Sequence, residues 1–240
     1  MRGALRAPAS PPRIMQVYNG PSLIDGSPIV AILTGYATPT SNDKTGPMAQ
    51  LWIMQADVEP HTATKTGADV SVCGSCPLRR VHGKTGGCYV TVHQAPLAVF
   101  RAWKRGKYPE HTGGRIRSSV EGIRFGAYGD PMALPLELLR ELRESFEFST
   151  GYTHQWHRKG SEGYSALLMA SCETGAQVDE VEAKGWRAFS TDPTGPGIEC
   201  ASDRTGETCA ECRQCDGAGD SPSIWINPHG SGAKKIAGAR

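Results

Sequence analysis

The cysteines of this chain fall into two groups whose spacing fits metal coordination. The first group has the pattern C-x2-C-x11-C and consists of Cys73, Cys76 and Cys88. The second has the pattern C-x8-C-x2-C-x2-C and consists of Cys200, Cys209, Cys212 and Cys215. A C-x2-C pair can turn two thiolates towards one ion, because small or polar residues between them allow a tight loop. The eighth cysteine, Cys172, stands apart and is expected to be a buried, inert thiol at a strand end.

The number of thiols in each group predicts a different kind of site. The second group supplies four ligands and can close a zinc site or an iron–sulfur cluster by itself, and its dense C-x2-C-x2-C run favours a cluster. The first group supplies three, which leaves one iron of a cluster open to a substrate or cofactor, or one zinc position open to water. Alternatively, His82 or His93 completes a closed zinc knuckle around the first group.

Composition shows that these thiols are not needed to hold the fold together. A chain of 240 residues with 38% hydrophobic residues is long enough to bury a core without metals or disulfides. No segment approaches the ~20 apolar residues that span a bilayer, and the start of the chain lacks the apolar core of a signal peptide. We therefore expect a cytoplasmic protein with reduced cysteines and no membrane partner.

Three familiar catalytic motifs are absent from the sequence. The Gly83-Lys84-Thr85 segment lacks the earlier glycine of a phosphate-binding loop, because that position is Leu78. No histidine has glutamate two residues later, as the zinc deaminases require, and no His-Glu-x-x-His helix occurs.

The elements that must position the cysteines alternate between short apolar runs and helical patterns. This alternation predicts an α/β fold with a mainly parallel sheet, open or curled into a partial (β/α) barrel. Strands are predicted at Ile29–Leu33, Leu51–Gln55, Gly122–Ala127, Gly151–Trp156, Ser165–Ala170, Trp186–Ser190 and Ser223–Asn227. Helices are predicted at Gln94–Arg105, Pro131–Phe146 and Val178–Lys184.

Four regions follow from this pattern. We expect a flexible N-terminal segment at 1–28, and an α/β core with the first cysteine group at 29–199. A cysteine-rich segment with a final strand occupies 200–229, and a basic tail occupies 230–240.

Polar residues lie at or near the ends of two predicted strands, and parallel α/β folds carry their catalytic and binding residues at strand ends. One strand finishes with Tyr128, Gly129 and Asp130, and Asp130 either caps the next helix or holds a ligand amine or hydroxyl. In the other, His154 and Gln155 interrupt an aromatic run that starts at Tyr152. A polar pair between aromatic rings suits a planar ligand, although a partly buried histidine bonded to backbone would give the same pattern.

Residues 101–124 carry a local excess of positive charge. Seven of them are basic and two acidic, beside Trp103 and Tyr108, in a chain with a net charge of only +2. The stretch could contact the phosphates of a nucleic acid or nucleotide, or form an ordinary solvated face.

The three-cysteine group followed by βα units with polar strand ends resembles the radical S-adenosylmethionine (radical-SAM) architecture. More closely, four segments resemble an uncharacterised family from bacteriophage genomes, over roughly residues 44–230. They are Cys73-Gly-Ser-Cys76-Pro, Cys88-Tyr-Val, Gly126-Ala-Tyr-Gly-Asp130 and Gly151-Tyr-Thr-His-Gln-Trp156. The spacing departs from the usual C-x3-C-x2-C, although Tyr89 follows Cys88 as the aromatic does in radical-SAM proteins.

The resemblance implies a [4Fe-4S] cluster on the first group, with one iron binding S-adenosylmethionine. It implies that Gly129 and Asp130 lie where the superfamily holds the methionine amino group, and that the second group is an auxiliary cluster. A phage-encoded protein would act in the host cytoplasm.

The sequence therefore predicts an iron–sulfur enzyme that modifies a nucleotide, a nucleic-acid base or a peptide. Asp130 and His154 are its candidate catalytic residues, and Tyr89, Tyr128, Gly129, Asp130, Tyr152 and Gln155 its candidate cofactor-binding residues. One alternative is a zinc protein that binds nucleic acid through 101–124 and the tail without catalysis. Another is a zinc-dependent barrel enzyme that modifies bases, as transglycosylases do.

Overall fold

The fold is an open α/β sheet. The computed structural model describes residues 14–39, 42–80, 86–217, 221–228 and 233. Within these residues nine strands form one sheet in the order β1-β2-β3-β4-β5-β6-β7-β9-β8. Their bounds are β1 Ile14–Pro21, β2 Pro28–Thr34, β3 Met48–Gln55, β4 Gly122–Tyr128, β5 Phe148–Thr153, β6 Met169–Cys172, β7 Ala188–Ser190, β8 Ile198–Glu199 and β9 Ile224–Trp225.

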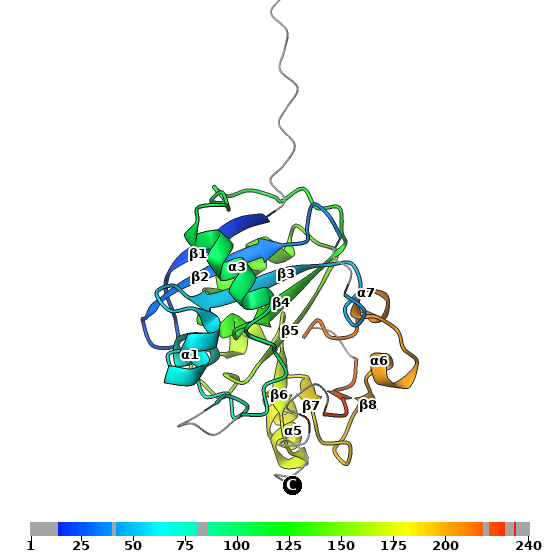
Figure 1. Cartoon of the computed structure of the whole chain (residues 1–240). Helices are drawn as coiled ribbons and strands as arrows, with labels where there is room; N and C mark the ends of the chain where they lie inside the picture. Colours follow the sequence, from blue (N-terminus) through cyan, green and yellow to red (C-terminus); the bar gives the residue numbers. More distant parts are fainter. Residues whose placement is uncertain (1–13, 40–41, 81–85, 218–220, 229–232, 234–240) are drawn as a thin grey trace, which may run out of the picture.

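The sheet combines an antiparallel meander with a longer parallel part. Strands β1, β2 and β3 pair antiparallel. From β3 onwards every pair is parallel, through β4, β5, β6, β7 and β9 to β8. In Figure 1 the sheet runs from β1 at the upper left to β8 at the lower right. The predicted α/β class with a mainly parallel sheet is confirmed.

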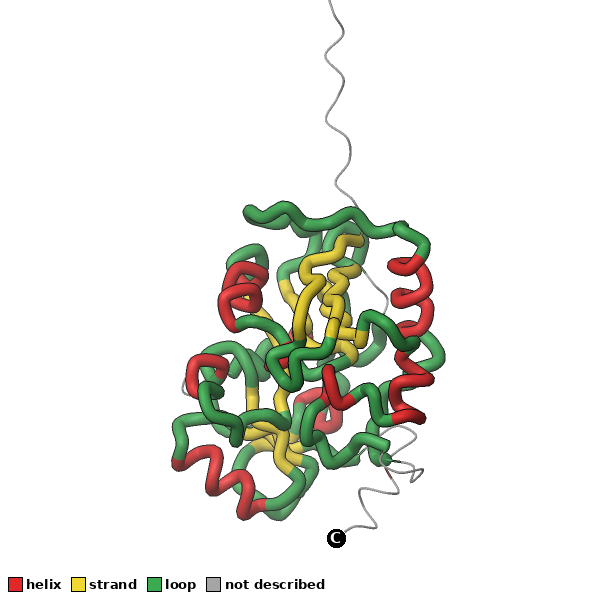
Figure 2. The backbone as a smooth tube through the Cα atoms, turned by 90° about the vertical axis from the view of Figure 1, so that its left-hand side faces the viewer, coloured by secondary structure: helices red, strands yellow, loops and turns green. Residues whose placement is uncertain are grey.

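Helices and loops cover both sides of the sheet (Figure 2). The long connection from β3 to β4 contains α1, α2 and α3 together with the first cysteine group, and α3 packs on β3. The connection from β8 to β9 contains α6, α7 and all four cysteines of the second group. The α-helices are α1 Pro60–Thr66, α2 Val70–Cys73, α3 Ala95–Lys104, α4 Leu136–Arg143, α5 Gly175–Ala183, α6 Ala201–Arg204 and α7 Cys209–Cys212. Two 3-10 turns are η1 Pro131–Ala133 and η2 Glu162–Tyr164.

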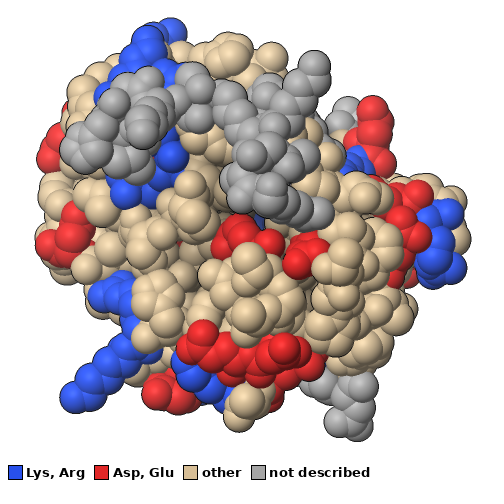
Figure 3. All heavy atoms as spheres, turned by 90° about the horizontal axis from the view of Figure 1, so that it is seen from below, with Lys and Arg blue, Asp and Glu red and all other residues tan. Residues whose placement is uncertain are grey.

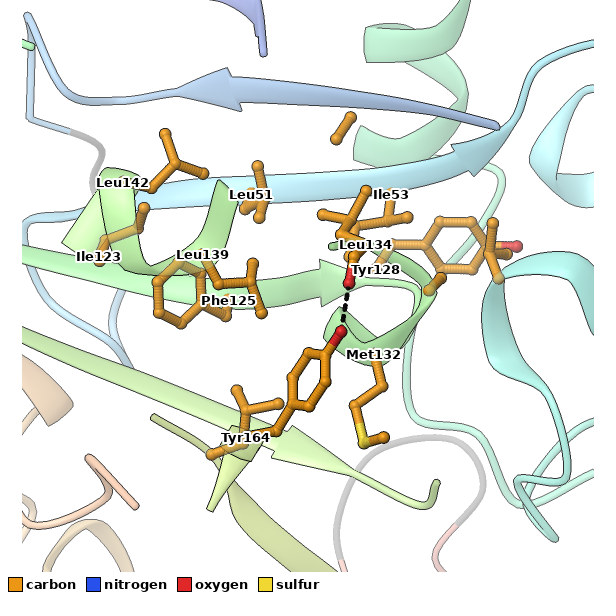
Figure 4. Close-up of a cluster of buried hydrophobic side chains, with 14 of the residues drawn as sticks. Leu51, Ile53, Ile123, Phe125, Tyr128, Met132, Leu134, Leu139, Leu142 and Tyr164 are labelled. Carbon is orange, nitrogen blue, oxygen red and sulfur yellow. Dashed lines mark hydrogen bonds between the residues drawn. The ribbon is translucent and has the colours of Figure 1, made fainter. Parts of the chain in front are cut away.

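The hydrophobic core lies between the sheet and α4 (Figure 4). Leu139 and Leu142 of α4 are buried, as are Ile123 and Phe125 of β4. Tyr164 is also buried, and its hydroxyl donates to a backbone carbonyl of this core, the Leu134 oxygen, over 2.8 Å. Since side chains alternate along a strand, the packing of Phe125 on this side turns its β4 neighbours to the opposite face.

Several predicted boundaries are wrong. Residues Ile14–Pro21, expected in a flexible segment, form β1, which pairs with β2 over its length. The predicted helix Pro131–Phe146 is a 3-10 turn and a shorter helix, because Pro135 offers no amide hydrogen for a continuous helix. The strand predicted at Ser165–Ala170 begins only at Met169.

The strand predicted at Gly151–Trp156 is β5, which begins at Phe148 and ends at Thr153. Consequently His154 and Gln155 follow the strand instead of lying within it. Residues 1–13 of the N-terminal segment and all but one residue of the basic tail lie outside the described residues, as does His82.

Candidate functional site

A cavity lies at the edge of the sheet where the parallel strands end. We call it the edge pocket; its volume is about 150 Å³. Its polar lining comes from the residues that directly follow four successive strands, β4, β5, β6 and β7. These residues are Gly129, Asp130, His154, Glu173 and Thr191. Aromatic and apolar walls complete it, formed by Tyr128, Tyr152, Phe189, Ile226 and Pro228.

The first cysteine group opens into this pocket. Cys73, Cys76 and Cys88 all line the edge pocket, and all three also line a second cavity of about 670 Å³. We call this second cavity the outer pocket; its lining includes His93. The structure thus brings the three predicted ligands of the first group to one junction between two cavities.

The loop that carries Cys73 and Cys76 is held by a buried amide. Gln155 Nε2 donates to the Cys73 carbonyl over 3.2 Å, and Gln155 Oε1 accepts from Ser75 Oγ over 3.2 Å. A Cβ on Gly74 would lie 2.3 Å from Gln155 Oε1, so only glycine fits there. Gln155 was predicted to bind a cofactor, but it is 1% exposed and is not part of the edge-pocket lining. In this structure its amide positions the cysteine loop.

An ion pair that sequence reasoning missed supports the same loop. Arg79 Nη2 lies 2.6 Å from Asp69 Oδ1, with side chains that are 12% and 3% exposed. Arg79 also donates to the carbonyls of Gly74 and Gly67, over 2.9 and 3.0 Å. The Arg79 guanidinium therefore joins both ends of the loop. In the sequence, the only indication of this role is that a charged residue lies near the cysteines.

Asp130 uses its carboxylate within the protein. Its Oδ1 accepts from Met132 N over 3.0 Å and from Thr153 Oγ1 over 2.8 Å, and its Oδ2 accepts from His154 N over 2.9 Å. Burial raises the pKa of this carboxyl, while these hydrogen bonds oppose the rise. Of the two readings of Asp130, the capping role is confirmed, because it caps the 3-10 turn Pro131–Ala133 and joins the ends of β4 and β5.

His154 lies between a carboxylate and a thiol. Its Nε2 is 2.7 Å from Glu173 Oε1, and its side chain also hydrogen bonds with Cys76. Burial is the largest single effect and lowers the pKa of His154. Cys76 and Glu173 together outweigh it and raise the pKa well above its ordinary value. Sequence reasoning found His154 but not Glu173, which lies one residue after the end of β6.

Two residues that line the edge pocket, Tyr128 and Thr191, carry hydroxyls without a hydrogen-bond partner among the described residues, and Tyr128 lines the outer pocket as well. Tyr128 Oη and Thr191 Oγ1 are buried and make no hydrogen bond within the part of the chain described. Buried polar groups normally have a partner, so unpaired hydroxyls on a cavity wall favour a ligand that supplies polar atoms there. This observation supports the prediction that Tyr128 belongs to a binding site.

Two thiols of the first group have raised pKa values, those of Cys73 and Cys88. Burial, followed by the neighbouring Cys76 thiol, raises the pKa of Cys73 well above its ordinary value. Burial likewise raises the pKa of Cys88 to about 11. Metal binding would therefore release protons.

Nowhere in the described chain are three or more His, Cys, Asp or Glu side chains arranged to hold a metal ion. The donor set fits a metal in residue type and shared location, but coordination requires the thiols to rotate towards one centre.

The second cysteine group gathers at a separate small hollow. All four thiols line it, beside Thr150 and Tyr152 of β5; they are Cys200, Cys209, Cys212 and Cys215. Arg187 holds the segment against β7, because its guanidinium pairs with Asp216 over 3.0 Å and donates to the Gln214 carbonyl over 2.7 Å. All eight cysteines are free of disulfides, as predicted, and Cys172 is a buried thiol at the end of β6, also as predicted.

Tyr152 forms a wall shared by the two cysteine sites. It lines the edge pocket and the hollow of the second group, its hydroxyl hydrogen bonds with Cys215, and its ring lies 4.3 Å from that of Phe189. Next to it on the sheet, Arg124 of β4 donates to Tyr89 Oη over 3.1 Å. The predicted cofactor-binding residues Tyr89 and Tyr152 thus lie along the boundary between the two sites.

Three of the seven basic residues of 101–124 contact other residues of the protein, and the other four, Arg105, Lys107, Arg115 and Arg117, are exposed. Arg101 pairs with Glu59 over 2.8 Å, and Lys104 lies over the Trp103 ring. Arg124 is directed to Tyr89, as described above. In the view from below, acidic side chains gather in the middle of the face and along one edge, while Lys and Arg lie mainly nearer its rim (Figure 3).

Comparison with known proteins found no matching family model, no matching curated protein and no matching solved structure. Among the described residues no helix is long and apolar enough to cross a bilayer. The two cysteine sites and the edge pocket are therefore the features of the chain that bear on its function.

Proposed function

We propose that the chain is an iron–sulfur enzyme of radical-SAM-like type, whose reaction takes place in the edge pocket. One observation carries this proposal. The three thiols of the first group, Cys73, Cys76 and Cys88, line the same cavity as the polar residues that follow the parallel strands. A metal centre held there would face a ligand directly, at the sheet edge where α/β folds bind their substrates.

The number of thiols supports a reactive centre at the first group. Three thiolates hold a [4Fe-4S] cluster with one iron left for another ligand, whereas the four thiols of the second group can saturate a structural or auxiliary centre. A cluster held by Cys73, Cys76 and Cys88 would, once reduced, supply the single electron needed for reductive cleavage of a C–S bond of S-adenosylmethionine. The parallel part of the sheet, from β3 to β9, takes the place of a partial barrel around this chemistry.

The chain's own residues serve this site in different ways. Gln155 and Arg79 hold the cysteine loop, and Asp130 fixes the ends of β4 and β5. Tyr128 and Thr191 offer hydroxyls to the bound molecule. The apolar and aromatic walls exclude water from it. We infer a substrate that is a nucleotide, a base or a peptide.

Metal analysis of anaerobically purified protein tests the proposal. Wild type should contain iron and sulfide, absorb broadly in the visible, and give a paramagnetic resonance signal on reduction. Cys88→Ala should lose the part of the iron that belongs to the first group, and Cys172→Ala, a buried thiol outside both groups, should keep all of it. Protein without iron and without visible absorption would refute the proposal. Zinc in its place, with activity that survives in air, would favour the zinc-dependent base-modifying enzyme instead.

A further inference from the structure

Besides the three thiols, the first cysteine group has a fourth potential ligand beside it. His154 lies on the edge-pocket wall together with Cys73, Cys76 and Cys88, and it contacts Cys76. Its side chain is only 16% exposed. Such a histidine is too enclosed to be an ordinary surface residue.

Two hydrogen bonds hold this histidine in place. Its backbone N donates to Asp130 Oδ2 over 2.9 Å, and its ring Nε2 is paired with Glu173 Oε1 at 2.7 Å. The backbone of Glu173 is held as well, because Glu173 N donates to Gln177 Oε1 of α5 over 2.7 Å. Both the position and the orientation of the imidazole are therefore set before any metal binds.

A carboxylate at one ring nitrogen determines what the other nitrogen can do. With Nε2 paired with Glu173, Nδ1 is the ring nitrogen that can bind a metal, and because Cys76 and Glu173 favour the protonated ring, metal binding at Nδ1 displaces a proton. Metal-ligating histidines commonly donate their second nitrogen to a carboxylate in this way, which fixes the tautomer and raises the basicity of the ligand. Three thiolates and one imidazole form a donor set that binds zinc and related divalent ions.

We propose that His154, positioned by Glu173, is the fourth ligand of the first cysteine site while no substrate occupies the edge pocket. His154 is then the group that an incoming ligand replaces. This inference rests on the proposed metal site at Cys73, Cys76 and Cys88, and it replaces the expectation that His82 or His93 supplies the fourth ligand. His93 lines the outer pocket but not the edge pocket, whereas His154 lines the edge pocket and contacts Cys76.

Cobalt(II) binding to the metal-free full chain tests the proposal, because the absorption of cobalt reports both thiolate ligands and coordination geometry. The spectrum of the first site is the difference between wild type and Cys88→Ala. In His154→Ala, the ligand-field bands of this difference spectrum should change, and added imidazole should restore them. His93→Ala is the matched control and should leave them unchanged.

Glu173 provides a second, graded test. Glu173→Ala should weaken cobalt binding at the first site about 10- to 100-fold, the usual effect of losing such a partner. Glu173→Gln keeps an oxygen that can accept from Nε2 and should recover most of the affinity. Pulsed paramagnetic resonance should detect coupling to an imidazole nitrogen in wild type and not in His154→Ala.

The outcomes separate this inference from the proposed function. If wild type shows no thiolate-to-cobalt absorption that Cys88→Ala removes, the metal site itself is refuted, and the ligand role of His154 with it. If that absorption is present but His154→Ala leaves spectrum and affinity unchanged, only the ligand role is refuted. A spectrum altered by His93→Ala and not by His154→Ala would assign the fourth position to the outer pocket.

Discussion

Replacing Gly74 by alanine should disrupt the first cysteine loop far more than its backbone strain alone explains. Gly74 has φ +54° and ψ −127°, a conformation outside the left-handed helical region that strains alanine by about 1–3 kcal/mol. The new Cβ would also lie 2.3 Å from Oε1 and 2.5 Å from Cδ of Gln155. The amide must therefore move and give up its bonds to Cys73 and Ser75, and each buried polar group left unpaired costs about 1–3 kcal/mol.

Gly106 provides a matched control for this substitution. It has φ +66°, and a Cβ there would meet nothing within 4 Å. Gly106→Ala should therefore show only the strain of about 1–2 kcal/mol. Gly74→Ala should be less stable than Gly106→Ala by a further ~2 kcal/mol or more.

Two measurements on both variants check this reasoning. Urea unfolding gives the free energies, and metal content after anaerobic loading reports on the sites. Gly74→Ala should lose metal from the first group and keep that of the second, while Gly106→Ala keeps both. Equal stability of the two variants would refute the claim that Gln155 holds the loop.

Three further predictions concern the site residues. Asp130→Ala leaves three donors without their acceptor and should destabilise the protein by about 3 kcal/mol or more in thermal unfolding. The control Asp179→Ala, on the exposed face of α5, should have little effect on stability. Similar losses of stability in the two variants would mean that Asp130 is not structural. In metal-free protein the alkylation rate of Cys88 should rise with pH up to its pKa of about 11. Near pH 8 this rate should be roughly 100-fold below that of an ordinary thiol, and a plateau by pH 9 would contradict the raised pKa. Cys212→Ala should lower the melting temperature, because a saturated metal site contributes to folding. The same substitution should abolish the loss of stability that a chelator causes in wild type. If the chelator destabilises Cys212→Ala as much as wild type, a structural metal at the second group is excluded.

The sequence was sufficient to predict the parallel core, because buried strands and amphipathic helices leave strong periodic signals. Strands β2, β3 and β4 and helix α3 lie close to where the apolar pattern predicts them. Strand β1 was missed because only one of its residues is fully buried, so its pairing with β2 leaves no apolar run. The two-residue strand β8 depends on its neighbour β9 and has no local signal.

The candidate site was predictable in its ligands but not in its supports. Cysteine spacing identified both groups, and the polar residues after two strands identified Asp130 and His154. The partner of His154 could not be found in this way, since Glu173 becomes its neighbour only when β5 and β6 pair. The same is true of Gln155 beneath the cysteine loop, whose contacts join residues about eighty positions apart.

The order of the last strands governs how the edge pocket is completed. Strand β9 comes last in the chain but lies inside the sheet, between β7 and β8. Ile226 and Pro228, which follow it, form the last wall of the edge pocket. Ile226 and Pro228 are therefore synthesised only after all four cysteines of the second group. Strand β9 has two residues, which is too short for its own hydrogen bonds to hold it in the sheet. Metal binding by the second cysteine group would thus be the last step in the assembly of the edge pocket, although the four thiols of that group do not line it.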